Sequence, residues 1–407
     1  MAGPLSHIRV LDLSRVLAGP WAAQNLGDLG AQVIKVERPG TGDDTRGWGP
    51  PWLKDAGGKD TTEGAYYLSV NRNKKSVTLD IAKPEGQAVV KELVAKCDVL
   101  IENYKVGALR RYGLSYDRLK PLNKGLIYCS VTGFGQSGPY CERPGYDFIF
   151  QGMGGLMSIT GERDGEPGAG PQKVGIAITD VLTGLYASLA ICAAITHRER
   201  SGEGQYIDCA LLDSIVAFNA NQIVSYFCSG RVPIRWGNAH PQVVPYEVFP
   251  TSDGHIILAV GNDGQFARFC AAAGCPELAD EARFRTNSQR IIHRRELAPI
   301  LADIMRQRTK REWIETLEAA TVPCGPINTM KEVFEDPQVQ HSRLRVDIPH
   351  RLGGTAPVVA SPMRLSATPV EYRLAPPLLG EHTREILGGL LGKSEAEIER
   401  LRAAAII

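Results

Sequence analysis

The segment VGIAITDVLTGLYASLAICAAITH, residues 174–197, carries one formally charged residue, Asp180, among small and apolar side chains. A carboxylate in a partly dry site must be hydrogen-bonded, paired with a cation or used in chemistry, because burying it bare is costly. Three roles are therefore open for Asp180: the N-cap of a helix, the partner of an ion pair, or a nucleophile. The stretch KVGIAI before it is strand-like and the stretch after it predicts a helix, whose N-terminus would keep the carboxylate ionised.

The N-terminal residues 8–37 have the pattern of a β-α-β unit, with strands at 8–14 and 31–37 and a helix at 21–30 between them. This unit predicts parallel strands. The turn before the helix has Ala18-Gly19-Pro20 in place of G-x-G-x-x-G, so a nicotinamide or flavin site is poorly supported. The helix start still offers backbone N–H groups to an anion.

The Gly/Pro-rich loop after the second strand contains Arg38, Arg46 and Trp48. Guanidinium groups there can bind the oxygens of a phosphate or a carboxylate, although a loop arginine is more often solvated. Tryptophans on loops tend to wall pockets. A short basic cluster, Arg72 with Lys74-Lys75, is typical of a wet surface.

Composition places few limits on function. Of the 407 residues, 43% are hydrophobic and 22% charged, as in ordinary globular proteins, and the net charge of +1 gives no field for nucleic acid or a membrane surface. Nine cysteines without C-x-x-C or zinc spacing indicate reduced thiols in the cytoplasm. We see no signal peptide, and the best membrane-spanning candidate, residues 181–197, is shorter than the roughly 20 residues that span a bilayer. A soluble, cytoplasmic protein is expected.

The order of elements predicts an α/β fold. Strands at 73–80, 97–103 and 126–135 and an amphipathic helix at 84–96 continue the alternation, which predicts a Rossmann-like, doubly wound large domain over residues 1–200. Residues 201–230 read as a linker, a strand and a long helix. Two strands around an SDG turn, followed by helices, predict a smaller α+β domain over residues 231–330. The tail, 331–407, ends in a helix with a capping box, Ser394 and Glu397.

The motifs taken together resemble one family. They are LAGPWAAQNLGDLGAQVIKVERPGTGDDTR, NRNKKSVTLD, VLIENYKVGALRRYGL, GFGQSGPYCERPGYDFIFQGMGGLMSITG, VGIAITDVLTGLYA, GNAHP, PCGPIN and LLGEHT. In this order they resemble the family III CoA-transferases (CaiB/BaiF, formyl-CoA transferase-like), in particular the branch that uses dicarboxylates. The resemblance implies that Asp180 is the acyl-carrying nucleophile, which forms a mixed anhydride and then an aspartyl-CoA thioester. It implies no metal and no cofactor besides the CoA thioester that is the substrate.

The resemblance also assigns binding residues. The CoA-binding positions are Val16, Arg38, Leu79, Asn103, Tyr104 and Arg111, with the two arginines on the phosphates and with Leu79 and Tyr104 giving apolar surface. The acyl or acid substrate is expected to meet Arg15, Leu17, Arg46, Trp48, Tyr146, Gly237, Asn238 and His240. Arg15 and Leu17 replace the His and Gln of formyl-CoA transferases, and an arginine there suits an acid with a second carboxylate. Residues 237–240 stand where those enzymes have a glycine-rich loop.

Four alternatives were weighed. The α-methylacyl-CoA racemases of the same superfamily need a histidine where this chain has Tyr146, in Gly145-Tyr146-Asp147, and tyrosine is a poor two-way base near neutral pH. A CoA-binding protein without turnover has no use for Asp180, and a dehydrogenase lacks its glycine fingerprint. The favoured hypothesis is a CoA-transferase that moves CoA from succinyl-CoA to a small dicarboxylic acid. The family resemblance implies an interlocked homodimer, without nucleic-acid or membrane partners, in which residues 331–407 return to the large domain.

Overall fold

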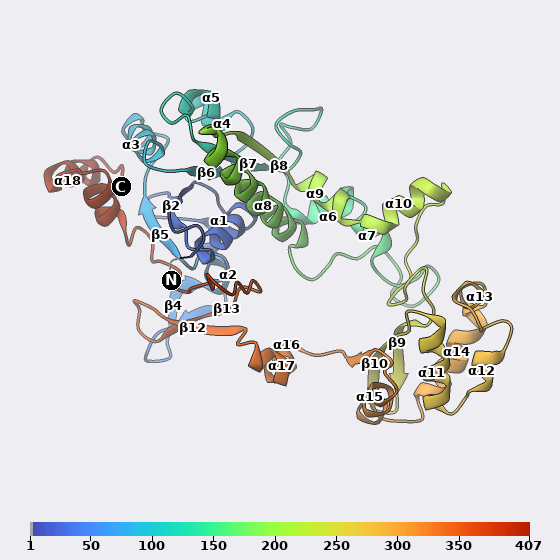
Figure 1. Cartoon of the computed structure of the whole chain (residues 1–407). Coiled ribbons are helices and arrows are strands. Elements are labelled where there is room, and N and C mark those ends of the chain that lie inside the picture. Colours follow the sequence, from blue (N-terminus) through green and yellow to red (C-terminus); the bar gives the residue numbers. More distant parts are fainter. Residues whose placement is uncertain (1–2) are drawn as a thin grey trace. The chain divides into compact units, whose positions relative to one another are not determined.

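A computed structural model describes residues 3–407 and divides the chain into two compact units (Figure 1). The first unit contains the chain up to Leu156, then Val174–Val224 and Gln338–Ile407. The second unit contains Met157–Lys173 and Ser225–Pro337. Both units are therefore assembled from segments that are distant in the sequence.

The first unit is built on a six-stranded parallel sheet of order β5-β2-β1-β6-β7-β8. Its strands are β1 (Arg9–Asp12), β2 (Gln32–Glu37), β5 (Lys74–Thr78), β6 (Val99–Glu102), β7 (Ile127–Thr132) and β8 (Tyr206–Ala210). The chain proceeds from β1 to β2 and β5 on one side, and from β6 to β8 on the other. The winding direction thus reverses between β1 and β6, and the predicted α/β class with a parallel sheet is confirmed.

Helices cover both faces of this sheet. Helix α1 (Ala18–Asp28) packs on β1, β2 and β6, and α8 (Ile178–Ser201) packs on β7 and β8 and along α1. On the opposite face, α3 (Pro84–Val94) and α18 (Glu395–Ala403) share a hydrophobic core with alternate strand residues such as Leu11, Ile34 and Leu100. The predicted capping box of α18 is present.

Helix α8 is long and apolar enough to cross a membrane by length and composition alone. Its packing on α1 and two strands is instead that of a core helix in a soluble α/β enzyme fold, as the sequence predicts. The segment before it, residues 174–177, is not a strand, so the strand-like reading of KVGIAI was wrong. The predicted long helix after β8 is broken into α9 (Leu211–Phe218) and α10 (Ala220–Ser229).

Smaller elements complete the first unit. Two antiparallel pairs join β3 (Trp52–Lys54) to β4 (Asp60–Gly64) and β12 (Arg345–Pro349) to β13 (Thr355–Val359). The short helices are α2 (Ala65–Ser69), α4 (Ala108–Arg111), α5 (Tyr116–Leu119), α6 (Asp147–Met153), α7 (Leu156–Ile159, at the unit boundary) and α17 (Pro337–His341). The C-terminal segment is tied to the sheet by backbone hydrogen bonds from Asn73 to Leu374 and from Asp80 to Ile406.

The second unit contains the antiparallel sheet β11-β10-β9 and a group of helices around its own apolar core. The predicted strand pair around the SDG turn is β9 (Tyr246–Thr251) and β10 (Gly254–Ala259), which β11 (Cys324–Pro326) extends. The helices are α11 (Asp263–Ala273), α12 (Glu277–Asp280), α13 (Asn287–Ile292), α14 (Arg294–Met305), α15 (Lys310–Ala319) and α16 (Met330–Glu335).

The predicted domain boundaries need correction, because the second unit contains Ser225–Pro337 instead of residues 231–330 and also contains an earlier segment. The sequence places residues 157–173 in the large domain, yet they belong to the second unit. The reason is local hydrogen bonding: Arg235 Nε donates to the carbonyl of Glu162, and the backbone N–H of Gly237 donates to the carbonyl of Gly161. The chain thus enters the second unit, returns to the first before α8, and enters the second again within α10.

Candidate active site

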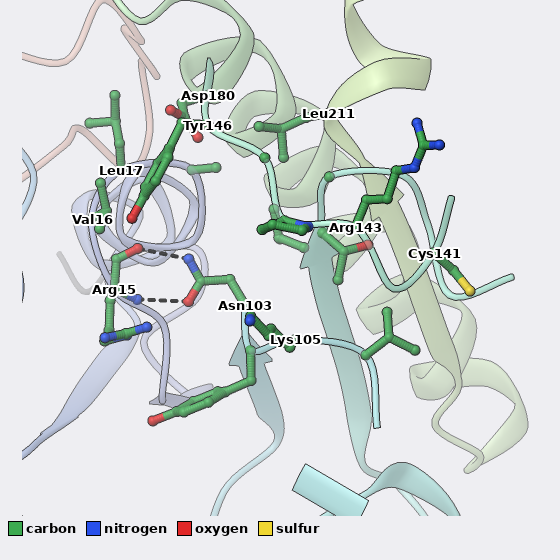
Figure 2. Close-up of a pocket in the computed structure, with 18 of the residues that line it drawn as sticks. Arg15, Val16, Leu17, Asn103, Lys105, Cys141, Arg143, Tyr146, Asp180 and Leu211 are labelled. Carbon is green, nitrogen blue, oxygen red and sulfur yellow. Dashed lines mark hydrogen bonds between the residues drawn. The ribbon is translucent and has the colours of Figure 1, made fainter. Parts of the chain in front are cut away.

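An open cavity of about 220 Å³ lies in the first unit, at the carboxyl ends of β1, β6 and β7 (Figure 2). Its lining comes from the β1–α1 turn, the segments 103–106, 131–133 and 141–146, and the single residues Asp44, Asp180 and Leu211. Because the winding of the sheet reverses between β1 and β6, this is the crevice where open α/β sheets bind their ligands. Seven sequence-predicted site residues meet here: Arg15, Val16, Leu17, Asn103, Tyr104, Tyr146 and Asp180.

Asp180 is the third residue of α8 and faces this cavity. The N-cap of α8 is Ala177, so Asp180 is not the cap. Among residues 3–407, no lysine, arginine or histidine forms an ion pair with it, so the second structural role is also excluded. The third role open from the sequence, that of a nucleophile, stays a prediction at this point.

The environment of Asp180 raises its pKa to about 7, through burial first and the negative charge of Asp147 second, while the backbone N–H of Ala18 donates to it and lowers the pKa. The sequence predicts that the N-terminus of α8 favours the charge of this carboxylate, but burial and Asp147 outweigh the stabilising contributions, and the net pKa shift is upward. A carboxylate with this raised pKa is also more basic, and hence a better nucleophile once it is ionised.

Asp147, the first residue of α6, holds the beginning of α8. Its Oδ1 accepts hydrogen bonds from the backbone N–H groups of Thr179, at 2.7 Å, and Asp180, at 3.4 Å. Its Oδ2 accepts one from Gln151 Nε2 at 2.6 Å. The first N–H groups of a helix lack partners within the helix. Asp147 of α6 accepts hydrogen bonds from two of them and thus caps the N-terminus of α8.

Gly184 allows α8 to approach the β1–α1 turn closely. A Cβ atom at this position would lie 2.6 Å from the carbonyl oxygen of Ala18 and 3.0 Å from Cβ of Trp21. Gly184 is one helical turn after Asp180, so the same close approach brings the Asp180 carboxylate to the N–H of Ala18. The D-x-x-x-G spacing in the sequence therefore has a steric reason.

The β1–α1 turn is bridged to the segment after β6 by the side chain of Asn103. Its Oδ1 accepts from the backbone N–H of Arg15 at 2.9 Å, and its Nδ2 donates to the Arg15 carbonyl at 2.7 Å (Figure 2). The Arg15 side chain is half exposed, with Nη1 3.1 Å from Asp44 Oδ2 and its guanidinium 5.8 Å from the Tyr104 ring centre. Asn103 thus fixes the backbone that carries Arg15, at the mouth of the cavity.

Five predicted residues of the first unit lie outside the lining of this cavity: Arg38, Arg46, Trp48, Leu79 and Arg111. Arg38, after β2, and Arg111, at the end of α4, are exposed. Trp48 is exposed and packs edge-on against Tyr66, with ring centres 5.1 Å apart. Leu79 is only 2% exposed and packs in the core under α3, so its side chain does not offer the apolar binding surface that the resemblance implies.

The substrate role predicted for Arg46 is contradicted by its surroundings. Its Nε and Nη2 each donate to Glu37 at 2.8 Å, and its Nη1 donates to Glu63 at 2.9 Å. Further bonds from Nη2 reach the Tyr67 hydroxyl and the Pro377 carbonyl. All of these groups are buried, so Arg46 ties the loop after β2 to the C-terminal segment.

The basic cluster at residues 72–75 is also not a wet surface. Arg72 pairs with Asp28 and is buried, and Lys74 Nζ lies 2.9 Å from Asp12 Oδ2 with both side chains at 0% exposure. Burial lowers the pKa of Lys74 to about 8, although the charge of Asp12 opposes this shift. Only Lys75 keeps an exposed partner, Glu385.

Gly237, Asn238 and His240 lie in the second unit, so their contribution to the cavity stays a prediction. Gly237 has φ +60°, a conformation that favours glycine. The His240 backbone N–H donates to the Tyr246 carbonyl, and Nδ1 accepts from the Gln242 N–H at 3.0 Å. Hydrogen bonds within the second unit therefore account for the observed conformation of this loop.

Sequence reasoning missed three residues near Asp180. Asp147 was read only as part of a racemase-like motif, and the hydroxyl of Thr132, a cavity-lining residue, is buried and has no hydrogen-bond partner within residues 3–407. Burial and the charges of Asp180 and Asp147 raise the pKa of Tyr66 to about 12. The stretch AYYLS around Tyr66 is an ordinary helical sequence, so no signal in it marks this position.

The family model described as CoA-transferase family III matches residues 5–383. The chain belongs to this family. Family III relatives include the succinate–glutarate CoA-transferase of Agrobacterium fabrum, 52% identical over 387 residues, which cover 95% of this chain and 96% of the relative. The succinyl-CoA:glutarate CoA-transferase of Homo sapiens is 44% identical over 404 residues, which cover 99% of this chain and 90% of the relative.

Solved structures agree with the family III assignment. A CaiB/BaiF family protein from Brucella suis is 46% identical and superposes with a TM-score of 0.84, covering 96% of this chain and 100% of that chain. The predicted family and the prediction of a CoA-transferase are thereby confirmed.

The raised pKa of Asp180 predicts a pH dependence. Since the ionised carboxylate is the reactive form, kcat/KM should rise with pH by about tenfold per unit and level off above pH 7. Asp147→Asn removes the neighbouring charge, so the midpoint should move to lower pH, by roughly one unit. The exposed cavity carboxylate Asp44 gives the control: Asp44→Asn should move the midpoint much less. An unshifted midpoint in Asp147→Asn would contradict this electrostatic account.

Gly184→Ala should separate α8 from the β1–α1 turn, because its methyl group has no room beside Ala18. We expect kcat to fall by about 10- to 100-fold, as for other small displacements of reacting groups. Gly175→Ala is the matched control, since a Cβ there meets open space. Steady-state kinetics and thermal unfolding of both variants are the measurements, and full activity in Gly184→Ala would show that the close contact is not needed.

Proposed function

We propose that this protein transfers CoA from succinyl-CoA to a small dicarboxylic acid, with glutarate as the first acceptor to test. The observation that carries the proposal is the partly buried carboxylate of Asp180, without a cation partner among residues 3–407, in the crevice at the switch point of the sheet. The names of the relatives that match this chain over most of their length point to the same pair of acids.

The reaction follows from the chemistry of a nucleophilic carboxylate. Asp180 attacks the thioester carbonyl of succinyl-CoA, the C–S bond breaks, and a mixed anhydride forms while the CoA thiolate leaves. The thiolate attacks the Asp180 carbonyl of the anhydride, which releases succinate and leaves an aspartyl-CoA thioester. The acceptor carboxylate repeats the two steps in reverse and leaves as the new acyl-CoA.

Each step exchanges one activated acyl group for another, so we propose that neither ATP, nor a metal, nor any further cofactor takes part. The backbone N–H of Ala18, which donates to the Asp180 carboxylate, is placed to stabilise negative charge on that oxygen when the Asp180 carbonyl is attacked.

For CoA we propose contacts with Val16, Asn103 and Tyr104 in the cavity and with the exposed guanidinium groups of Arg38 and Arg111 for its phosphates. We further propose that residues 237–240 cover the intermediate during turnover. For the second carboxylate of the acid we propose Arg15, whose ion pair with Asp44 is half exposed and hence weak enough to exchange for a substrate carboxylate.

We also propose an interlocked, cytoplasmic homodimer without nucleic-acid or membrane partners. Exposed apolar side chains concentrate on α6, α8 and α9 of the first unit: Phe148, Ile149, Met153, Leu185, Tyr186, Leu189, Val216 and Phe218. Contiguous apolar surface of this kind marks a protein interface. A second copy of the chain is the partner that the family resemblance suggests.

The racemase alternative has less support. The residue at the place of the racemase histidine is Tyr146, which is 71% exposed, and the adjacent Asp147 is engaged in capping α8. A proton shuttle on and off carbon needs two groups that titrate near neutral pH on opposite sides of the substrate. With Tyr146 in place of the histidine, this chain lacks one of the two groups of the racemase pair.

An acceptor screen tests the transfer. Purified protein, succinyl-CoA and a panel of mono- and dicarboxylic acids of matched length should give a new thioester with one or more dicarboxylates, detected by mass spectrometry. Asp180→Ala should abolish this product and keep CoA affinity, whereas Arg15→Leu should lower kcat/KM for diacids at least tenfold more than for monoacids, since it removes one ion-pair contact of about 1.5–3 kcal/mol. Transfer by Asp180→Ala, or equal losses for both acid classes in Arg15→Leu, would refute the respective assignment.

The dimer proposal predicts the effect of a charge on α8. Leu189→Glu places a carboxylate on the exposed apolar surface and should convert a dimer to monomers, as measured by light scattering during size-exclusion chromatography. Leu122→Glu is the matched control, because Leu122 is equally an exposed leucine but lies on a loop outside these helices. A monomeric wild type, or a dimeric Leu189→Glu, would count against this interface.

A further inference from the structure

The β1–α1 turn contains a strained residue, Val16. Its φ angle of +69° lies in the left-handed region, which glycine adopts freely and a β-branched residue rarely does. Such a conformation persists only where the surroundings hold it. Val16 lies between Arg15 and Leu17, which line the cavity with it.

Asp43 is the group that holds Val16. The Val16 backbone N–H donates to both oxygens of the Asp43 carboxylate at 3.2 Å. The same carboxylate accepts from the backbone N–H and the hydroxyl of Thr45, at 3.0 and 2.8 Å, and from Lys35 Nζ at 2.9 Å. All of these donors converge on one carboxylate, which is thereby fixed in position.

Lys35 holds the other side of the same turn. Its Nζ donates to the carbonyl of Ser14 at 3.0 Å as well as to Asp43, and the side chains of Lys35 and Asp43 are both 0% exposed. The ion pair is therefore hydrogen-bonded to the backbone on both sides of Arg15, at the Ser14 carbonyl through Lys35 and at the Val16 N–H through Asp43. A buried ion pair of this kind is often no more stable than an apolar pair of similar size, so stability alone is a weak explanation for it.

Both partners are charged. Burial opposes ionisation of Asp43, but the charge and hydrogen bond of Lys35 with the bonds from Thr45 bring its pKa down to about 2. Burial likewise opposes the charge of Lys35, but Asp43, Asp12 and Glu37 raise its pKa above the ordinary value. The pair hence stays ionised over the whole pH range in which the protein is folded and active.

The β1–α1 turn, which Lys35 and Asp43 hold, lies beside Asp180 in the cavity. Two residues after Val16, the backbone N–H of Ala18 donates to the Asp180 carboxylate, and Val16, Leu17, Ala18 and Asp180 line one cavity. We propose that Lys35 and Asp43 are positioning residues of the transfer reaction: through Ser14 and Val16 they hold the turn so that the Ala18 N–H points at Asp180. This inference rests on the proposed nucleophilic role of Asp180.

The test is the double variant Lys35→Met/Asp43→Asn, which removes both buried charges together and leaves neither partner unpaired. We expect kcat to fall by about 10- to 100-fold, with KM for succinyl-CoA within about threefold, because the nucleophile loses its orientation and its hydrogen-bond donor. The loss of that donor should also raise the pKa of Asp180 by roughly 0.5–1 unit. This pKa is read from the side-chain carboxyl ¹³C resonance, assigned with Asp180→Asn, and needs no turnover.

Arg72→Met/Asp28→Asn is the matched control. It removes another buried ion pair next to α1 that makes no hydrogen bond to the turn. It should lose a similar free energy of unfolding and leave the Asp180 titration unchanged. If Lys35→Met/Asp43→Asn behaves like this control, the pair is merely structural and the inference is wrong.

The experiment also decides between the explanations if the double variant does not fold or if the wild type shows no transfer. If the double variant does not fold, Thr45→Val removes only the hydroxyl bond to Asp43, and the Asp180 pKa should rise by a smaller amount; no rise would overturn the inference. If the wild type transfers CoA to no acid, the proposed function fails. The ¹³C titration still decides in that case whether the pair positions the Ala18 N–H.

Discussion

The first unit is organised around one constraint, a carboxylate kept in a partly dry crevice without a cation. Three buried cations near the carboxyl ends of β1 and β2 each have a carboxylate partner among residues 3–407: Lys35 with Asp43, Lys74 with Asp12, and Arg46 with Glu37 and Glu63. None of them neutralises Asp180. Burial and a second acid, Asp147, instead raise its pKa to about 7, while one N–H group opposes this shift.

The same ion pairs explain how a dinucleotide-like turn works without its glycines. In the usual fingerprint, glycine allows the tight turn between the first strand and the helix and the close approach of a phosphate. Here a valine takes the left-handed conformation, held by Asp43, while Lys74 donates to the carbonyl of Pro20 at the start of α1. Charged side chains thus hold a turn that glycines would otherwise make possible. The strand, turn and helix are therefore present although the glycine motif is absent from the sequence.

Much of the architecture was predictable because it depends on local patterns. The strand and helix periods locate β1, β2, β5, β6, β7 and β8, and a single charge in an apolar segment singles out Asp180. What failed depends on partners distant in the chain. Lys74 looks solvated until Asp12, 62 residues earlier, is seen beside it, and the Asp180 pKa is raised by burial and by the charge of Asp147, 33 residues earlier. Residues 157–173 were misassigned for the same reason, because their hydrogen-bond partners begin at Arg235.

The neighbourhood of Asp147 and Asp180 has an energetic consequence for the proposed reaction. Burial and the nearby negative charge make the free Asp180 carboxylate a high-energy species, and acylation removes its charge. Whatever disfavours the anion in the resting enzyme therefore favours the anhydride and the aspartyl thioester relative to it. A carboxylate fully solvated by water would be a more stable anion, and the anhydride and the thioester would then lie higher in free energy relative to it. The acid that caps α8 thus also flattens the free-energy profile, so that activated acyl groups pass in either direction with little net change.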